Sequence, residues 1–241
     1  PSFPKGSLKM KKRLFAALLA ALGAIASPAA QAAPYPPHDI MSIVRPDHID
    51  MPLADKVMSD LYDHAGNYPP RFDNDADQQR AQAEAAQLNR LFAGIIKVKA
   101  VTPQQPEKYI NVPYHLARLN AMAHNMDMPN AAAQADRYFE EMIKLLNGKP
   151  KEKARAQGEY GAFLVGSNRI DRAMPLLQQA VKGGDGNAHL PLGMAYLMKG
   201  RQAEAVKHLQ THQKNHPQDE RARVLLEAIE KGTFKVHRVN P

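Results

Sequence analysis

The chain has 241 residues, no cysteine and a formal net charge of +8 at neutral pH. The lack of cysteine excludes disulfide bonds, thiol catalysis and thiolate metal sites, so the packing of secondary structure must supply the stability. A basic excess is common among nucleic-acid-binding proteins, and its position along the chain decides whether that class remains open.

The first predicted element is a cleavable export signal. Met10 begins a short basic segment, an apolar run follows over residues 14–26, and an Ala-x-Ala pattern ends at Ala32. Residues 1–32 are therefore interpreted as upstream sequence plus a signal peptide that starts at Met10 and is cleaved after Ala32. The apolar run has about 13 residues, fewer than the roughly 20 that a membrane-spanning helix needs. The sequence thus predicts a soluble, exported, periplasmic protein without a lipid anchor, and an uncleaved membrane anchor is the alternative.

This leader also carries most of the excess positive charge. Five of the 32 lysines and arginines, and no acidic residue, lie within residues 1–32. The expected mature chain has 27 basic against 24 acidic residues, a net charge of +3. Because nucleic-acid binding depends on many positive charges, so small an excess argues against a nucleic-acid partner.

Two regions without an evident repeat come next in the chain. Residues 33–51 are rich in proline and are expected to form an extended N-terminal tail. Residues 52–105 are interpreted as a non-repeat helical region, with amphipathic helices expected over 52–64 and 75–98.

Residues 106–232 carry a helical repeat. A first helical hairpin is expected over 113–146, and the segments that begin at Tyr160 and Leu192 superpose at a period of 32. The period aligns four pairs of identical residues: Gly161 with Gly193, Arg169 with Arg201, Ala173 with Ala205, and Leu177 with Leu209. Periods of roughly 20 to 50 residues are typical of stacked repeat architectures. A polar capping helix is expected over 220–231, with a C-terminal tail over 233–241.

The turns inside these hairpins are expected at three residues that tolerate a left-handed backbone. Gly200 follows the first helix of the last repeat, and Asn168 and Asn130 occupy the corresponding positions upstream. Glycine adopts positive φ without steric cost, and asparagine is the next most tolerant residue.

The last repeat resembles a known family. Seven of its residues fall at the spacing of the tetratricopeptide repeat: Leu192, Gly193, Tyr196, Gly200, Ala205, Leu209 and Pro217. The resemblance covers residues 154–219 well and residues 106–147 weakly. It implies an all-α fold, an α-solenoid of roughly four antiparallel helical hairpins followed by the capping helix.

The same resemblance implies a binding groove lined by the first helix of each hairpin. Carried over position by position, its lining comprises Arg155, Asn187, Leu190, Met194, Leu197 and Met198. Flexible methionines adapt to irregular apolar surfaces, so the expected partner is a peptide or amphipathic helix of another cell-envelope protein. The alternative for Leu190 and Leu197 is core packing against the final helix.

No catalytic pattern is evident in the sequence. A His-Glu-x-x-His helix, a phosphate-binding glycine loop and a Gly-x-Ser-x-Gly turn are all missing. We therefore expect a non-catalytic scaffold or adaptor without a cofactor.

A second hypothesis is a periplasmic copper- or zinc-binding protein. His208, His212 and His216 recur at four-residue spacing, which places them on one helix face. His208 and His216 would lie about 12 Å apart along the axis, so only one adjacent pair could share an ion. His208 and His212 are the candidate pair, and no third ligand is evident. A Met- and His-containing segment at 122–128 is expected to be core packing with His124 at the surface.

Overall fold

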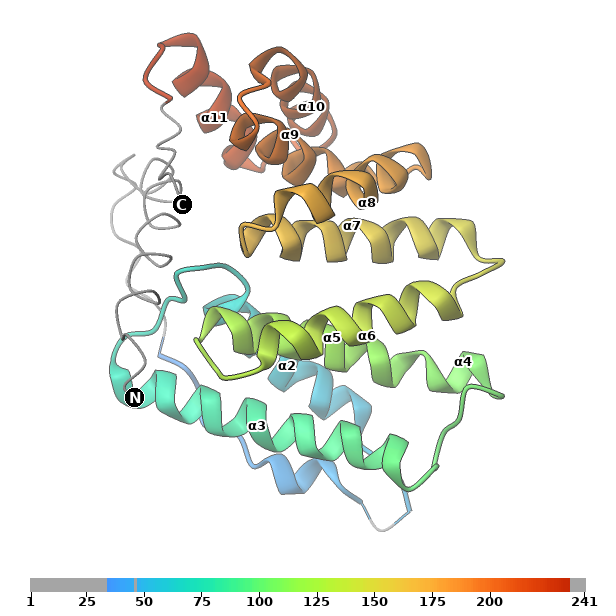
Figure 1. Ribbon diagram of the computed structural model, residues 1–241. Coiled ribbons are helices and arrows are strands. Elements are labelled where there is room, and N and C mark those ends of the chain that lie inside the picture. The colour runs from blue at the N-terminus through green and yellow to red at the C-terminus, as the bar shows by residue number, and fades with distance from the viewer. Residues whose placement is uncertain (1–33, 46, 235–241) are drawn as a thin grey trace, which may run out of the picture. The chain divides into compact units, whose positions relative to one another are not determined.

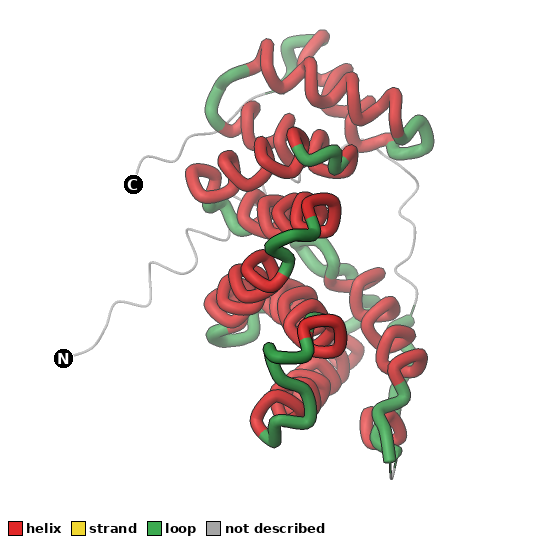
Figure 2. The backbone as a smooth tube through the Cα atoms, turned by 90° about the vertical axis from the view of Figure 1, so that its right-hand side faces the viewer, coloured by secondary structure: helices red, strands yellow, loops and turns green. Residues whose placement is uncertain are grey.

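The computed structural model describes residues 34–45 and 47–234. The predicted signal peptide, its cleavage site after Ala32 and most of the predicted C-terminal tail lie outside the described residues. The chain divides into two compact units, with described residues 34–146 in one and 147–234 in the other. Every regular element within these ranges is a helix, as Figure 2 shows. The all-α prediction is confirmed for this part of the chain.

In the first unit, two helices pack against a helical hairpin. Its elements are η1 (Ile40–Ile43), α2 (Met51–Ala65), α3 (Asp75–Lys97), α4 (Pro106–Tyr109), α5 (Asn111–Asn125) and α6 (Ala131–Leu145). α5 and α6 pair along their lengths, and α2 and α3 each contact α5 (Figure 1). The α5–α6 hairpin therefore belongs to this unit, and the boundary falls at residues 146 and 147, inside the range 106–232 expected to be one array.

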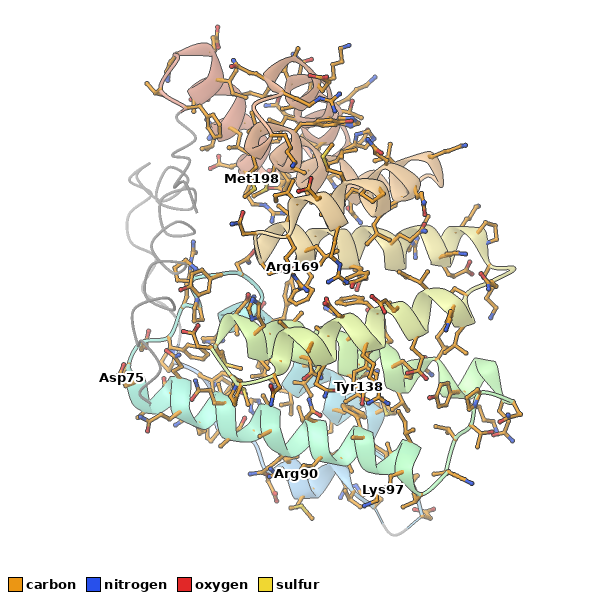
Figure 3. The ribbon with its side chains drawn as sticks, in the orientation of Figure 1. Asp75, Arg90, Lys97, Tyr138, Arg169 and Met198 are labelled. Atoms are coloured by element: carbon orange, nitrogen blue, oxygen red, sulfur yellow. The ribbon has the colours of Figure 1, made fainter. Side chains whose placement is uncertain are left out.

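Local sequence explains where α2 and α3 begin. The Asp50 carboxylate accepts a hydrogen bond from the Leu53 amide, and the Asn74 side chain accepts one from the Asp77 amide. Such side chains satisfy the free amides of a first helical turn. Figure 3 labels Asp75 and Lys97 at the two ends of α3. Both helices match the expected ranges to within one residue at each end.

The expectation of an extended tail over residues 33–51 is wrong from Pro34 onward. Tyr35 is 1% exposed, and Ile40 and Ile43 are buried. The segment folds as a 3-10 turn whose first cap is the Asp39 side chain. Its proline content suggested an exposed tail, whereas the polar partners that hold it lie on α2 and α3, more than 20 residues away in sequence.

The second unit contains two consecutive hairpins and a final helix. Its elements are α7 (Pro150–Gly166), α8 (Ile170–Lys182), η2 (Gly186–Ala188), α9 (His189–Met198), α10 (Gln202–Asn215) and α11 (Glu220–Glu230). α7 pairs with α8, α9 pairs with α10, α9 also contacts α7 and α8, and α11 packs on α10 (Figure 1). This arrangement matches the predicted hairpin repeat with its capping helix.

The 32-residue repeat places a close crossing of two helices at the same position in each hairpin. An added Cβ at Gly161 would lie 2.5 Å from Leu177 Cγ, and one at Gly193 would lie 2.9 Å from Leu209. Both distances are too short for a real contact, so only glycine lets each helix pair approach so closely. Each hairpin therefore uses the same glycine and the same leucine at its crossing.

The three expected turn residues adopt the left-handed conformation. Asn130 has φ of 61°, Asn168 has φ of 60° and Gly200 has φ of 73°. The turn positions predicted from the repeat are thus confirmed.

Candidate functional site

The predicted groove residues lie on or beside α7 and α9, the first helices of the two hairpins in residues 147–234. Arg155 and Asn187 are exposed, and Met194 and Met198 are partly exposed. Met198 is labelled at the C-terminal end of α9 in Figure 3. These four side chains can contact a partner in this structure.

Leu190 and Leu197 are core residues. They are 5% and 2% exposed, respectively, because α9 is apolar around most of its circumference and contacts α7, α8 and α10. A helix that is apolar on all sides is buried on most of them, so its sequence alone does not show which side remains open. The apolar contribution of α9 to a surface therefore comes from Met194 and Met198.

A buried carboxylate that sequence reasoning missed lies beside Arg155 and Asn187. Asp185 is 8% exposed, and its carboxylate accepts a hydrogen bond from the backbone N–H of Asn187 at 3.1 Å. Burial raises the pKa of Asp185, and this hydrogen bond and the positive charge of Arg155 partly oppose the rise. Gly158 makes room for it, because a Cβ there would collide with the carboxylate. A glycine in the middle of α7 was the only sequence signal for this contact.

The two candidate metal-binding histidines do not pair with each other. His208 Nδ1 lies 2.9 Å from Nδ1 of His189 on α9, and the His208 ring stacks on Tyr196. His212 is 3% exposed, and its Nε2 lies 2.9 Å from an Asp219 carboxylate oxygen. Among the residues that the structure describes, no group of three or more histidine or acidic side chains could hold a metal ion. The geometry therefore gives the metal hypothesis no support.

Two methionines of segment 122–128, Met122 and Met126, pack in the core of the first unit. Met122 is 3% exposed and Met126 is fully buried, whereas His124 is partly exposed. Both features agree with the interpretation of this segment as core packing.

A second polar cluster, also missed from the sequence, anchors the N-terminal segment of the first unit. His38 Nδ1 lies 2.8 Å from Glu84 on α3, and its Nε2 lies 2.8 Å from Asp60 on α2. Tyr35 donates its hydroxyl to Glu84 at 2.7 Å, and burial together with this carboxylate raises the Tyr35 pKa. Burial alone would raise the Asp60 pKa, but hydrogen bonds from Lys56 and His38 hold it below its usual value. The cluster joins residues 34–45 to both helices.

Residues 164–229 match the family model for the tetratricopeptide repeat. This part of the chain therefore carries tetratricopeptide repeats. The match begins in the last turn of α7 and ends in α11, so it includes α8, the whole α9–α10 hairpin and most of the capping helix. No curated protein and no solved structure matches this chain.

The tetratricopeptide repeats indicate a protein–protein interaction scaffold, because stacked hairpins of this kind form extended binding surfaces. None of the described helices combines the length and the apolar composition needed to cross a membrane. The predicted resemblance and the helical-repeat fold are confirmed together.

Proposed function

We propose that this protein is a non-catalytic, periplasmic scaffold or adaptor that binds a peptide or helix of another cell-envelope protein. The observation that carries the proposal is the tetratricopeptide repeat match over residues 164–229, because the family is generally non-catalytic and binds proteins. Periplasmic location is supported by the signal-peptide pattern that ends at Ala32.

The proposed contact surface, called the α9 surface below, comprises Arg155, Asn187, Met194 and Met198. The two methionines offer flexible apolar contacts near the C-terminal half of α9, and Arg155 and Asn187 offer polar contacts near its N-terminal end. Such a surface suits an amphipathic partner helix, since its apolar side would face Met194 and Met198 and its polar side chains would reach the rim. Leu190 and Leu197 are buried and are not part of this surface.

In-cell photocrosslinking tests this surface. A photoreactive amino acid replaces Met194 or Met198, and Gln210, which is exposed on the second helix α10, serves as the matched control position. We expect a discrete adduct from Met194 and Met198 whose partner, identified by mass spectrometry, carries an export signal of its own. The same adduct from Gln210 with none from α9 would overturn the surface, and an adduct with a cytoplasmic protein would overturn the proposed partner class.

Fractionation tests the proposed location. The mature chain should be recovered from the periplasmic fraction, and the mass of its N-terminal peptide should correspond to a chain that begins at residue 33. A chain that keeps residues 10–32 and remains with the cytoplasm would contradict the proposal.

A further inference from the structure

The hairpin of α9 and α10 contains a histidine pair at its interface. Nδ1 of His189, the first residue of α9, lies 2.9 Å from Nδ1 of His208 in the middle of α10. The ring centroids are 5.1 Å apart, and both side chains are partly buried. The pair therefore links the beginning of one helix of the hairpin to the other.

This contact limits how many protons the pair can carry. A nitrogen–nitrogen contact of this length needs one N–H donor and one lone pair as acceptor. One added proton is tolerated, because an imidazolium can still donate to its neutral neighbour. A second added proton places an N–H on both facing nitrogens, so the hydrogen bond becomes a contact between two donors and two positive charges.

Three groups act on the pair directly. They are Tyr196 on α9, which stacks on His208; His212 on α10; and Asp185 in the loop before η2. Arg155 on α7 and His216, just after α10, act in turn on Asp185. Burial lowers the pKa of His189 and nearby His212 lowers it further, while Asp185 opposes both. Burial and His189 lower the pKa of His208. The single carboxylate in this set does not outweigh burial and the neighbouring histidines.

His212, one turn further along α10, does not join the contact between His189 and His208. Its Nε2 lies 2.9 Å from an Asp219 carboxylate oxygen, and its ring stacks on His216 with centroids 4.6 Å apart.

We propose that the α9–α10 hairpin is a pH-sensitive joint, closed near neutral pH and loosened by full protonation of the His189–His208 pair at mildly acidic pH. A histidine that is buried in the closed hairpin regains its ordinary affinity for protons, with a pKa of about 6.5, when the hairpin opens. The open form then binds more protons than the closed form. The stability of the closed hairpin is therefore fully present above about pH 6.5 and falls as the pH is lowered below it.

Loosening of α9 would also displace Met194 and Met198. The joint would thus release a bound partner on acidification, a consequence that rests on the proposed function. The joint itself needs no partner, so it can be tested on the purified chain alone.

Hydrogen exchange measured at pH 7.5 and pH 5.5 on the full chain tests the joint. After correction for the intrinsic exchange rate, we expect amides of residues 189–215 to open about tenfold more often per pH unit for each extra proton that the open form binds. Amides of α7 and α8 form the internal control and should change less. The variant His208→Gln should lose most of the pH response, whereas His48→Gln, which changes an exposed histidine outside this unit, should keep it.

Equal pH responses in the two hairpins, or a full response in His208→Gln, would overturn the proposal. Should that variant fail to fold at pH 7.5, the imidazole nitrogens of the unaltered chain are titrated by NMR instead. The proposal requires that His189 and His208 titrate in two coupled steps. Independent titration of both residues near pH 6.5 would overturn it, and none of these results depends on whether the α9 surface binds a partner.

Discussion

The two units of the chain hold their helices together in different ways. In residues 147–234, the same glycine–leucine crossing recurs in both hairpins, at Gly161 with Leu177 and at Gly193 with Leu209. In residues 34–146, a buried polar cluster around Glu84 joins an irregular segment to two helices. The glycine–leucine crossing recurs in the sequence, whereas the Glu84 cluster occurs once. This difference explains why only one of the units can be identified from periodicity.

The largest predicted effect concerns the polar cluster. Glu84→Ala leaves the Tyr35 hydroxyl and His38 Nδ1 without their acceptor in a buried site. Loss of one partner from such a site costs about 3–5 kcal/mol, so the free energy of unfolding of residues 34–146 should fall by that order. Hydrogen exchange as a function of urea concentration, read from peptides of each unit, measures the change.

Asp63→Ala is the matched control for this variant, because Asp63 is an exposed acid on α2 in the same unit. It should change the free energy of unfolding by less than about 0.5 kcal/mol. A similarly small change in Glu84→Ala would show that the cluster does not hold the N-terminal segment.

The second prediction compares two glycines in helices. Gly193→Ala places a methyl group against Leu209 at a helix crossing, and overpacking of this kind costs about 1–3 kcal/mol. Gly94→Ala on α3 meets no atom within 4 Å and should instead stabilise its helix by about 0.5–1 kcal/mol. Urea unfolding of both variants tests whether glycine is needed for helix packing at Gly193 and not at Gly94. Equal changes of the same sign in the free energy of unfolding would contradict this difference.

The third prediction concerns the left-handed turn between α7 and α8. Asn168→Ala puts a less tolerant residue at φ of 60° and should destabilise the second unit by about 1 kcal/mol. Asn168→Gly should be neutral or slightly stabilising, because glycine carries no steric penalty there. If thermal unfolding shows that alanine and glycine act alike, the turn does not need this conformation.

The smallest effect concerns how the free energy of unfolding decreases at acidic pH. Hydrogen bonds from Arg221 and His212 outweigh burial and hold the Asp219 pKa well below its usual 3.8. The folded state therefore binds this proton more weakly, so the contribution of Asp219 is present above about pH 4 and is lost as the pH falls. Asp219→Asn keeps a residue suited to the cap of α11 and should flatten this part of the stability curve. If the free energy of unfolding of the variant decreases with pH as in the unaltered chain, the charge of Asp219 contributes nothing to stability.

The features predicted correctly from the sequence are local or periodic. Asn130, Asn168 and Gly200 could be recognised because a left-handed turn selects few residue types, and Gly161 and Gly193 because they recur at the same place. The ranges of α2 and α3 were predicted from local apolar patterns, and the side chains that cap their first turns also lie next to them in the chain.

The missed features depend on contacts between distant residues. Tyr35 and His38 meet Glu84 across 49 and 46 positions, and no local pattern distinguishes them from the polar residues of a tail. His208 and His212 were the candidate pair of the alternative metal hypothesis, whereas the partner of His208 is His189 on the neighbouring helix. The burial of Leu190 and Leu197 likewise depends on which sides of α9 other helices cover, information that an almost wholly apolar helix does not contain.

The affinity of the partner for the α9 surface is the most direct test of the proposed function. Calorimetry would compare the partner trapped by crosslinking with the unaltered chain, with Met194→Glu/Met198→Glu and with the matched control Gln210→Glu. We predict at least a tenfold weaker affinity for the double variant, about 1.4 kcal/mol, and an unchanged affinity for Gln210→Glu. Equal binding by the folded double variant would contradict an interaction surface on α9.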